Sequence, residues 1–212
     1  MLALSGAELT ALAARGRVLQ TKLGAPAVIE HDDLITKVWS RRQWPSSDWF
    51  HPYAHRFRRN AERLRMRGVD APEVTAYGRV TGTNKRYVTY PLIPGEALRA
   101  ASFDPRAFAA FIASLHSRGV YFRSLHLGNV LVCNGAFALI DVTDVTFRRG
   151  ALSLAMRARN LRFLASYPAD AARLEPRGVF FAAYGAAGDL GAHDVATLER
   201  AFARSLESGT RG

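Results

Sequence analysis

The stretch from Gly119 to Asp144 reads GVYFRSLHLGNVLVCNGAFALIDVTD, and it decides the fold. Two short apolar runs, Val130–Val132 and Phe137–Ile140, flank the dipeptide Asn134-Gly135. Asn-Gly between such runs is the strongest short signal for a β-hairpin, because a type I′ turn needs positive φ at both central positions. The stretch therefore predicts two antiparallel strands joined by a two-residue turn.

The predicted turn also determines which residues face each other. The expected pairs are Cys133 with Ala136, Leu131 with Ala138, and Asn129 with Ile140. Asn129 then opens one strand, and Asp141 follows the end of its partner. Because paired Cβ atoms lie roughly 5 Å apart, an amide oxygen and a carboxylate come together at the open end. Two hard oxygen ligands so placed suit Mg²⁺ held jointly with substrate phosphates, so we predict metal ligands at Asn129 and Asp141. An ordinary hairpin with polar residues at its open end is the alternative interpretation.

The segment before the hairpin favours the metal site over this alternative. Asp104-Pro105 combines a helix N-cap with Pro at the first helical position. Apolar residues then repeat at helical spacing until Gly119, which is a typical C-cap. A buried helix thus leads into a polar loop, a hairpin and an aspartate. The loop SLHLGN, Ser124–Asn129, resembles the Asp-Leu-His-x-Gly-Asn loop of small-molecule kinases, and Asp141 resembles the strand-end metal-binding aspartate of protein kinases.

The whole-chain composition sets the broad class. With 212 residues, the chain fits one medium domain or two small lobes. A hydrophobic content of 49% and 22% charged residues are typical of a globular protein. The single cysteine, Cys133, excludes an internal disulfide framework, and we interpret it as a small core residue. No apolar run reaches the roughly 18 residues that span a bilayer, and the start lacks a basic n-region, so we expect a cytoplasmic protein.

The formal charge of +11 comes largely from two clusters of arginine. The first comprises Arg41, Arg42, Arg56, Arg58, Arg59, Arg63, Arg65 and Arg67, and the second Arg148, Arg149, Arg157, Arg159 and Arg162. One interpretation is a set of solvated helix faces. The other is a surface for an anionic partner, because the arginine fork binds two phosphate oxygens at once. A phosphorylated glycolipid, an anionic membrane and nucleic acid are the candidates; nucleic acid would require exposed aromatics among the arginines, for which Trp44 and Trp49 are the only hint.

The N-terminal part has the order of strands and helix found in a kinase N-lobe. The expected elements are strands over Arg17–Leu23, Ala27–Glu30 and Leu34–Trp39, a turn through Gly24-Ala25-Pro26, a helix over Tyr53–Arg67, and a hairpin of Val74–Val80 with Arg86–Leu92. Lys37 resembles the third-strand lysine that contacts the ATP phosphates; an exposed strand lysine is the alternative. No G-x-G-x-x-G lies between the first two strands, so a glycine-rich loop over the phosphates is not predicted.

The phase of the predicted helix decides which side chain lies near Lys37. Its apolar face carries Phe57 and Leu64, with Asn60 beside them, whereas Glu62 points away at 100° per residue. We therefore expect Asn60 at the nucleotide site and Glu62 in solvent, without the lysine–glutamate pair usual in kinases. Beyond the hairpin, TYPLIPGE resembles the hinge between lobes, where backbone groups at Tyr90 and Leu92 would meet the adenine edge.

Together these motifs resemble the lipopolysaccharide kinase and Kdo kinase branch of the protein-kinase-like superfamily, near proteins described as toluene tolerance proteins. The stretches that carry the resemblance are RFRRNAERL…GVDAP, TYPLIPGEALR, GVYFRSLHLGNVLV, LIDVTD and RARNLRFL. The resemblance implies an α+β, two-lobe fold, with an N-lobe over 1–92 and a mostly helical C-lobe over 93–212. It implies ATP and Mg²⁺, and it places around the nucleotide Lys37, Asn60, Tyr90, Leu92, Asn129 and Asp141. It further implies phosphorylation of a lipopolysaccharide-core sugar, and hence an anionic glycolipid acceptor and peripheral contact with the inner membrane.

The loop departs from the family at Ser124. Kinases of this class place an aspartate there to take or orient the proton of the acceptor hydroxyl, and serine carries no charge near neutral pH. Asp144 and His126 are the candidate substitutes, although His126 also fits a structural role and Asp144 a surface turn. Three functions therefore stay open: an ATP-dependent sugar kinase, a pseudokinase that regulates envelope assembly, and a kinase-like nucleic-acid-binding module. The catalytic candidates are Ser124, His126 and Asp144.

Overall fold

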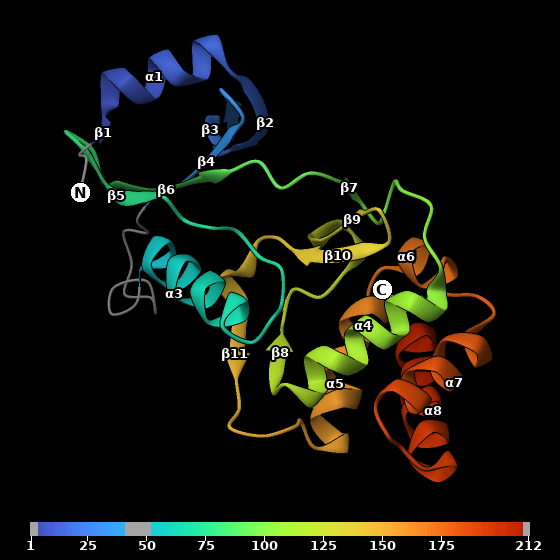
Figure 1. Cartoon of the computed structure of the whole chain (residues 1–212). Coiled ribbons are helices and arrows are strands. Elements are labelled where there is room, and N and C mark those ends of the chain that lie inside the picture. Colours follow the sequence, from blue (N-terminus) through green and yellow to red (C-terminus); the bar gives the residue numbers. More distant parts are fainter. Residues whose placement is uncertain (1–3, 41–51, 210–212) are drawn as a thin grey trace. The chain divides into compact units, whose positions relative to one another are not determined.

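The structure is a computed structural model that describes residues 4–40 and 52–209 (Figure 1). The possible nucleic-acid-binding residues of the sequence analysis lie outside the described residues; they are Arg41, Arg42, Trp44 and Trp49. The chain forms two compact units. One comprises Met1–Met66 and Ala71–Ile93, and the other Arg67–Asp70 and Pro94–Gly212. The first is built on a sheet and the second on helices, so the predicted α+β class is confirmed.

A six-stranded sheet forms the first unit, in the order β1-β5-β6-β4-β3-β2. The strands are β1 (Leu4–Ser5), β2 (Arg17–Lys22), β3 (Ala25–His31), β4 (Leu34–Ser40), β5 (Ala76–Thr81) and β6 (Lys85–Pro91). All neighbours are antiparallel except the short β1, which pairs in parallel with β5 and was not predicted. The predicted turn between the first two strands was misplaced. Leu23 and Gly24 both adopt positive φ, 52° and 72°, and form a two-residue turn, so Ala25 and Pro26 belong to β3.

Within the described residues, the first unit also contains the helices α1 (Gly6–Arg15) and α3 (Tyr53–Arg65). Ser5 caps α1 in a capping box with Glu8, as an N-cap serine is expected to do. On α3, Phe57 and Asn60 are buried, at 0% and 3% exposure. The side chain of Glu62 is 58% exposed and pairs with Arg58 one turn away, at 3.4 Å. The predicted helical phase is therefore confirmed.

The central hairpin lies in the second unit and has the predicted register. Strands β9 (Val130–Cys133) and β10 (Ala136–Leu139) pair Cys133 with Ala136 and Leu131 with Ala138. The turn residues Asn134 and Gly135 have φ of 50° and 80°, the positive values that a type I′ turn requires. Ile140 N–H donates to Asn129 O at 3.0 Å, which extends the pairing to the open end. A short strand, β7 (Glu96–Ala97), pairs with the outer edge of β9.

A second, smaller pairing was missed by the sequence analysis. We expected a mostly helical C-lobe, and the hairpin was the only pair of strands that we predicted in it. Strand β8 (Val120–Phe122) pairs antiparallel with β11 (Val145–Phe147). Three-residue strands are too short to show an alternating pattern, and their pairing joins segments that are distant in sequence. Their ends bring Arg123 beside Asp144, where Arg123 N–H donates to Asp144 O at 3.2 Å.

Five helices complete the described part of the second unit. They are α4 (Pro105–Ser117), α5 (Leu154–Ala165), α6 (Pro168–Ala172), α7 (Arg177–Ala187) and α8 (Ala192–Gly209). As predicted, Asp104 caps α4 by accepting from Arg106 N–H at 2.9 Å. Helix α4 packs on α7 and α5 packs on α8 (Figure 1). The core of this unit includes the buried side chains of Phe108, Phe180 and Phe202. None of the helices in the described ranges is long and apolar enough to cross a membrane.

Candidate active site

The loop Ser124–Asn129 connects β8 to β9 and is anchored by its own leucines. Leu125 and Leu127 are fully buried, whereas Ser124 before them and His126 between them are only half-buried. Short backbone bonds tighten the loop: Leu125 N–H donates to Phe122 O at 3.2 Å, and Asn129 N–H donates to His126 O at 2.9 Å. Apolar residues at alternate positions therefore hold the loop in the core and turn its polar side chains outward.

Asn160 of α5 fixes the first end of this loop. Its side-chain amide bonds both backbone groups of Phe122: Nδ2 donates to Phe122 O at 2.6 Å, and Oδ1 accepts from Phe122 N–H at 3.2 Å. Asn160 is 1% exposed, so both bonds are shielded from water. An unpaired backbone group at this depth would carry the full cost of desolvation, about 1–3 kcal/mol. The amide thus acts as a strand neighbour for Phe122, two residues before Ser124.

A buried chain of hydrogen bonds continues from Asn160 through His116. Because Asn160 Oδ1 is an acceptor, His116 Nε2 donates to it at 3.1 Å, and His116 Nδ1 accepts from the Tyr184 hydroxyl at 2.6 Å. The Tyr184 oxygen in turn accepts from Arg157 Nη1 at 3.4 Å. Burial lowers the pKa of His116 to about 3, and the charge of Arg157 acts in the same direction. The imidazole is therefore neutral and ties α4, α5 and α7 to the loop.

Arg157 corrects one prediction. We counted it among the surface arginines of the second cluster, but it is 5% exposed. Besides its bond to Tyr184, its Nε donates to Leu152 O at 3.0 Å. This arginine is a structural residue inside the helical unit and does not contribute to an anion-binding surface.

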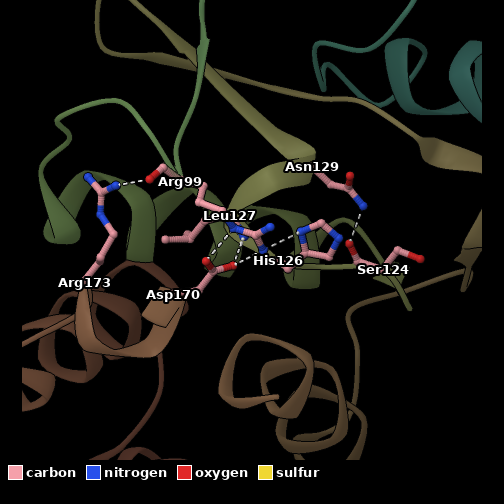
Figure 2. A network of polar contacts seen from close by, with 7 residues as sticks. All are labelled: Arg99, Ser124, His126, Leu127, Asn129, Asp170 and Arg173. Atoms are coloured by element: carbon pink, nitrogen blue, oxygen red, sulfur yellow. Dashed lines mark hydrogen bonds and ion pairs between the residues drawn. The ribbon is translucent and has the colours of Figure 1, made fainter. Parts of the chain in front are cut away.

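Asp170 of α6 fixes the other end of the loop (Figure 2). Its Oδ2 accepts from Leu127 N–H at 2.9 Å. Arg99 donates two hydrogen bonds of 2.8 Å to the same carboxylate, from Nε to Oδ1 and from Nη2 to Oδ2. Asp170 is 1% exposed, and a bidentate guanidinium is the partner best suited to a buried carboxylate. Arg173 also donates to the backbone oxygens of Arg99 and Ala101, which steadies the segment that carries Arg99.

The contacts of His126 support its structural interpretation. Its Nδ1 lies 3.4 Å from Arg99 Nη2, and its ring centroid lies 4.8 Å from that of Tyr167. Burial lowers the pKa of His126, the nearby Arg99 lowers it further, and Asp170 and Asp141 oppose the shift. A neutral ring then accepts at Nδ1 from Arg99. Gly128, two residues further on, leaves little room for a side chain, because a Cβ there would lie 3.2 Å from the His126 ring and 3.3 Å from Arg99 Nη1.

Ser124 and Asp144 lie together, although 20 residues separate them in the chain. Ser124 Oγ is 3.4 Å from Asp144 Oδ2, longer than the usual hydroxyl hydrogen bond of about 2.7–2.8 Å. Asp144 occupies the end of a short 3₁₀ turn, Val142–Asp144, directly before β11. The pairing of β8 with β11 therefore brings a carboxylate to the serine that replaces the usual loop aspartate.

Asn129 and Asp141 offer oxygen ligands at the open end of the hairpin. Asn129 Nδ2 donates to Ser124 O at 2.9 Å, so its amide oxygen points the opposite way (Figure 2). Within 4–40 and 52–209, no hydrogen bond to that oxygen occurs. Asp141 adopts the left-handed region, φ 53° and ψ 44°, a costly conformation for a residue with a side chain and one that gathers at functional sites.

This donor set fits Mg²⁺. An amide oxygen and a carboxylate leave the remaining ligands to phosphates and water, which is the usual arrangement for this ion. In the described part of the chain, no group of three or more His, Cys, Asp or Glu side chains gathers as an all-protein metal site. Asn129 and Asp141 would therefore hold the ion together with the phosphates of a bound nucleotide.

The remaining predicted residues belong to the first unit. Lys37 Nζ lies 5.5 Å from the ring centroid of Trp39 and 5.9 Å from that of Phe57, and so near the inner face of α3. Tyr90 is 6% exposed and stacks on Phe57 at 5.5 Å. Leu92 N–H donates to Asp33 O at 2.8 Å and is therefore occupied. In the predicted contact with adenine, Leu92 would use its carbonyl oxygen. The convergence of Lys37 on Asp141 stays a prediction.

Sequence reasoning missed the residues that hold the loop. Asn160 did carry a signal, because an amide directly before Leu161 and one turn before Leu164 is unusual on the apolar face of a helix. Arg99 and Asp170 gave none, since 71 residues separate them and each lies in an unremarkable local sequence. Their pairing depends on the packing of α6 beside the loop.

No protein-family model matches this chain, and no curated protein sequence does. Solved structures match along most of its length. The aminoglycoside-3′-phosphotransferase of type VIII is 15% identical in sequence and has a TM-score of 0.63. The match covers 93% of this chain and 97% of the phosphotransferase chain. WaaP in complex with acyl carrier protein is 18% identical, with coverages of 93% and 92% and a TM-score of 0.52.

Two further structures extend the comparison. The aminoglycoside phosphotransferase APH(3″)-Id from Streptomyces rimosus, in complex with ADP and streptomycin, is 12% identical, with coverages of 94% and 97% and a TM-score of 0.58. WbdD is 15% identical with a TM-score of 0.52, and the match covers 85% of this chain but 48% of WbdD. At these identities the likeness is one of fold. The chain has the protein-kinase-like fold, as its sequence predicted.

Proposed function

We propose that this chain is an ATP-dependent phosphotransferase that phosphorylates a sugar hydroxyl of a lipopolysaccharide-core type glycolipid at the cytoplasmic face of the inner membrane. A fold shared with WaaP, with WbdD and with an ADP-bound aminoglycoside phosphotransferase supports the reaction class. The loop Ser124–Asn129 and the charge of +11 support an anionic sugar acceptor. One observation carries the proposal: the hydroxyl of Ser124 and the carboxylate of Asp144 face each other beside Asn129, at 3.4 Å.

The chemistry follows from this apposition. The acceptor hydroxyl lies at the Ser124–Asp144 pair, and its oxygen attacks the γ-phosphorus of ATP while the bond from that phosphorus to the oxygen of the leaving ADP breaks. The proton of the hydroxyl passes to the Asp144 carboxylate, and Ser124 orients the acceptor through a hydrogen bond. Bound Mg²⁺ would supply charge neutralisation at the phosphates.

Rigidity of the loop is part of the proposed mechanism. Phosphoryl transfer depends mainly on positioning and electrostatic stabilisation, with little covalent work left to the protein. Asn160 fixes the chain at Phe122, and Asp170 fixes it at Leu127. The four residues between these clamps include Ser124, so its hydroxyl is held in place before the acceptor arrives.

The direct test is phosphate transfer from labelled ATP to purified lipopolysaccharide-core acceptors in the presence of Mg²⁺. Asp144→Asn removes the proposed base with little change in shape, and it should lower turnover by about 10²–10⁴-fold, the usual contribution of a general base. Asp189→Asn is the matched control, because Asp189 is an exposed aspartate of the helical unit outside the site, and its turnover should stay at the wild-type value. Transfer that is equal in both variants would contradict the assignment of Asp144.

A pseudokinase is the second candidate, and two observations favour it. Ser124 lacks the charge of the usual loop aspartate, and the strands β2 and β3 are joined by the tight Leu23–Gly24 turn in place of a glycine-rich loop. A pseudokinase would gain stability from nucleotide without transferring phosphate to any acceptor, because ligand binding alone stabilises the folded state. Thermal unfolding with ATP, with Mg²⁺ and with both, beside the transfer assay, distinguishes the two functions.

A further inference from the structure

A groove of about 600 Å³ lies between α5 and α8, on residues that the proposed active site does not use. Its lining comprises Ala155, Ala158, Arg159, Arg162, Ser166, Ala201, Arg204 and Ser205. The two helices pack against each other, and apart from its arginines the groove is lined by the small side chains of alanine and serine. The volume falls within the range of about 300–1,000 Å³ that is typical of small-molecule sites.

Three arginines surround this groove. Arg159 and Arg162 project from α5 and Arg204 from α8, and all three are exposed. Among the described residues, none of their guanidinium groups takes part in an ion pair or a hydrogen bond. No carboxylate belongs to the lining. Three like charges around one concavity create a positive potential that attracts an anion.

Three other arginines of the same unit are buried or paired with a carboxylate. Arg157, on the same helix, is buried and bonded to Leu152 and Tyr184. Arg99 is neutralised by Asp170, and Arg177 pairs with Glu175. Within the described part of the chain, the arginines of the groove form no ion pair of this kind, so the positive charge there can act on a ligand.

The backbone beneath the groove is held in place. On the inner face of α5, Asn160 bonds Phe122 and His116, and it is 1% exposed. Arg159 and Arg162 therefore extend from a helix that is anchored on its other side, and a ligand that engages them need not order the backbone. A prepared site of this kind loses less entropy on binding.

We propose that the α5–α8 groove is a binding site for a phosphate-bearing ligand, a phosphomonoester carried on a sugar or on a lipid headgroup. Each guanidinium group can donate two parallel hydrogen bonds to a phosphate. Three guanidinium groups offer more donors than the two oxygens of one carboxylate can accept, and they suit the three oxygens of a phosphomonoester better. The hydroxyls of Ser166 and Ser205 already donate to backbone oxygens, so the arginines are the donors for the ligand. The groove is larger than one phosphate ion, and the rest of the volume accommodates the group that carries it. The proposal does not depend on the proposed function, because it invokes no residue of the Ser124–Asp144 site.

The test measures binding to two sources of the same phosphate chemistry. Calorimetric titration with glucose 1,6-bisphosphate probes a soluble ligand, and sedimentation with phosphatidylcholine vesicles, with and without phosphatidic acid, probes a headgroup. Arg204→Ala should weaken binding to the productive probe about tenfold or more, the value of a lost charged hydrogen bond. Arg162→Lys should weaken it less than Arg162→Ala, since lysine keeps the charge and loses the fork.

Arg200→Ala is the matched control. Arg200 is also an exposed arginine of α8, one turn before Arg204, and it does not line the groove. Its loss changes the net charge equally and should alter binding less than twofold. Binding of the bisphosphate or of the acidic vesicles, with this pattern of variants, supports the proposal and identifies the source. Absence of binding to both probes, or an equal effect of Arg200→Ala and Arg204→Ala, would overturn it. Unfolding curves of each variant verify that the helical unit is intact.

Discussion

At position 124 the side chain is a serine, and the nearest carboxylate contact of its hydroxyl is Asp144, 3.4 Å away on another segment. The serine at position 124 lacks the negative charge of the aspartate that the resemblance to kinases implies there. Asp144, 20 positions later in the chain, supplies a carboxylate beside it. In the proposed mechanism the base has moved across the loop, while the acceptor position is unchanged. Two further single residues hold the loop in place. The buried side chains of Asn160 and Asp170 accept hydrogen bonds from the backbone N–H groups of Phe122 and Leu127.

Moving the carboxylate back to position 124 tests this interpretation. Ser124→Asp alone would place two carboxylates side by side, and their repulsion would raise the pKa of one of them. The double variant Ser124→Asp with Asp144→Asn avoids this and should recover part of the turnover that Asp144→Asn loses. Ser124→Asn with Asp144→Asn is the control without a carboxylate, and it should recover nothing. A double variant no faster than Asp144→Asn in the labelled-ATP assay would refute the exchange of roles.

The Asp170 clamp predicts a stability cost. Asp170→Asn weakens the pairing with Arg99 and disturbs the acceptor of Leu127 N–H, and we expect a loss of about 1–3 kcal/mol, the cost of a buried polar group left poorly paired. The lower end is favoured, because the Arg99 side chain is 47% exposed and can be solvated by water. Urea unfolding measures the change. The exposed Asp189→Asn should stay within about 0.5 kcal/mol of wild type, and an equal effect in both variants would contradict the role of the clamp.

At the scale of elements, short pieces of sheet and helix position the site. The hairpin β9–β10 supplies Asn129 and Asp141, the pair β8–β11 joins Ser124 to Asp144, and the buried hydrogen bonds of His116 connect α4, α5 and α7 to β8. The strands among these elements are only three or four residues long, so buried polar contacts add to the few ladder hydrogen bonds that position the loop. The helical unit should therefore respond to the protonation of its buried histidine.

The pH dependence of stability tests this. The folded pKa of His116 is lowered to about 3, whereas the unfolded chain protonates near 6.5. Below 6.5 the unfolded state binds a proton that the folded state does not, so stability is greatest above that pH and falls as pH decreases. Between pH 7 and pH 5 the expected loss is about 2 kcal/mol. His116→Gln removes this titration but not that of the other histidines, and its unfolding free energy should decline less over the same interval; an unchanged decline would contradict the prediction.

At the scale of the whole molecule, the residues predicted to contact the nucleotide are distributed over the chain. Lys37 and Tyr90 belong to the first unit, and Asn129 and Asp141 belong to the second. The arginines that contribute to the net charge of +11 include both structural residues, such as the buried Arg157, and the exposed residues at the α5–α8 groove.

Nucleotide binding provides the test at this scale. A ligand present at about 100 times its Kd stabilises the folded state by roughly 2.7 kcal/mol, so ATP with Mg²⁺ should raise the unfolding temperature above that with ATP alone. Asp141→Asn should remove the part that depends on Mg²⁺. Asp189→Asn is a close control, because Asp189 also adopts a left-handed backbone, with φ of 50° against 53° for Asp141. Equal Mg²⁺-dependent stabilisation of the two variants would exclude Asp141 as a ligand.

The sequence by itself determined the elements whose information is local. The Asn134-Gly135 turn imposed the register of the hairpin, Asp104 began α4, and the spacing of apolar residues set which face of α3 is buried, since each depends on residues a few positions apart. Tertiary structure alone decided the apposition of Ser124 and Asp144, the pairing of Arg99 with Asp170 and the burial of Arg157. These contacts join distant segments, and a charged residue becomes structural only when packing removes it from water and supplies its partner.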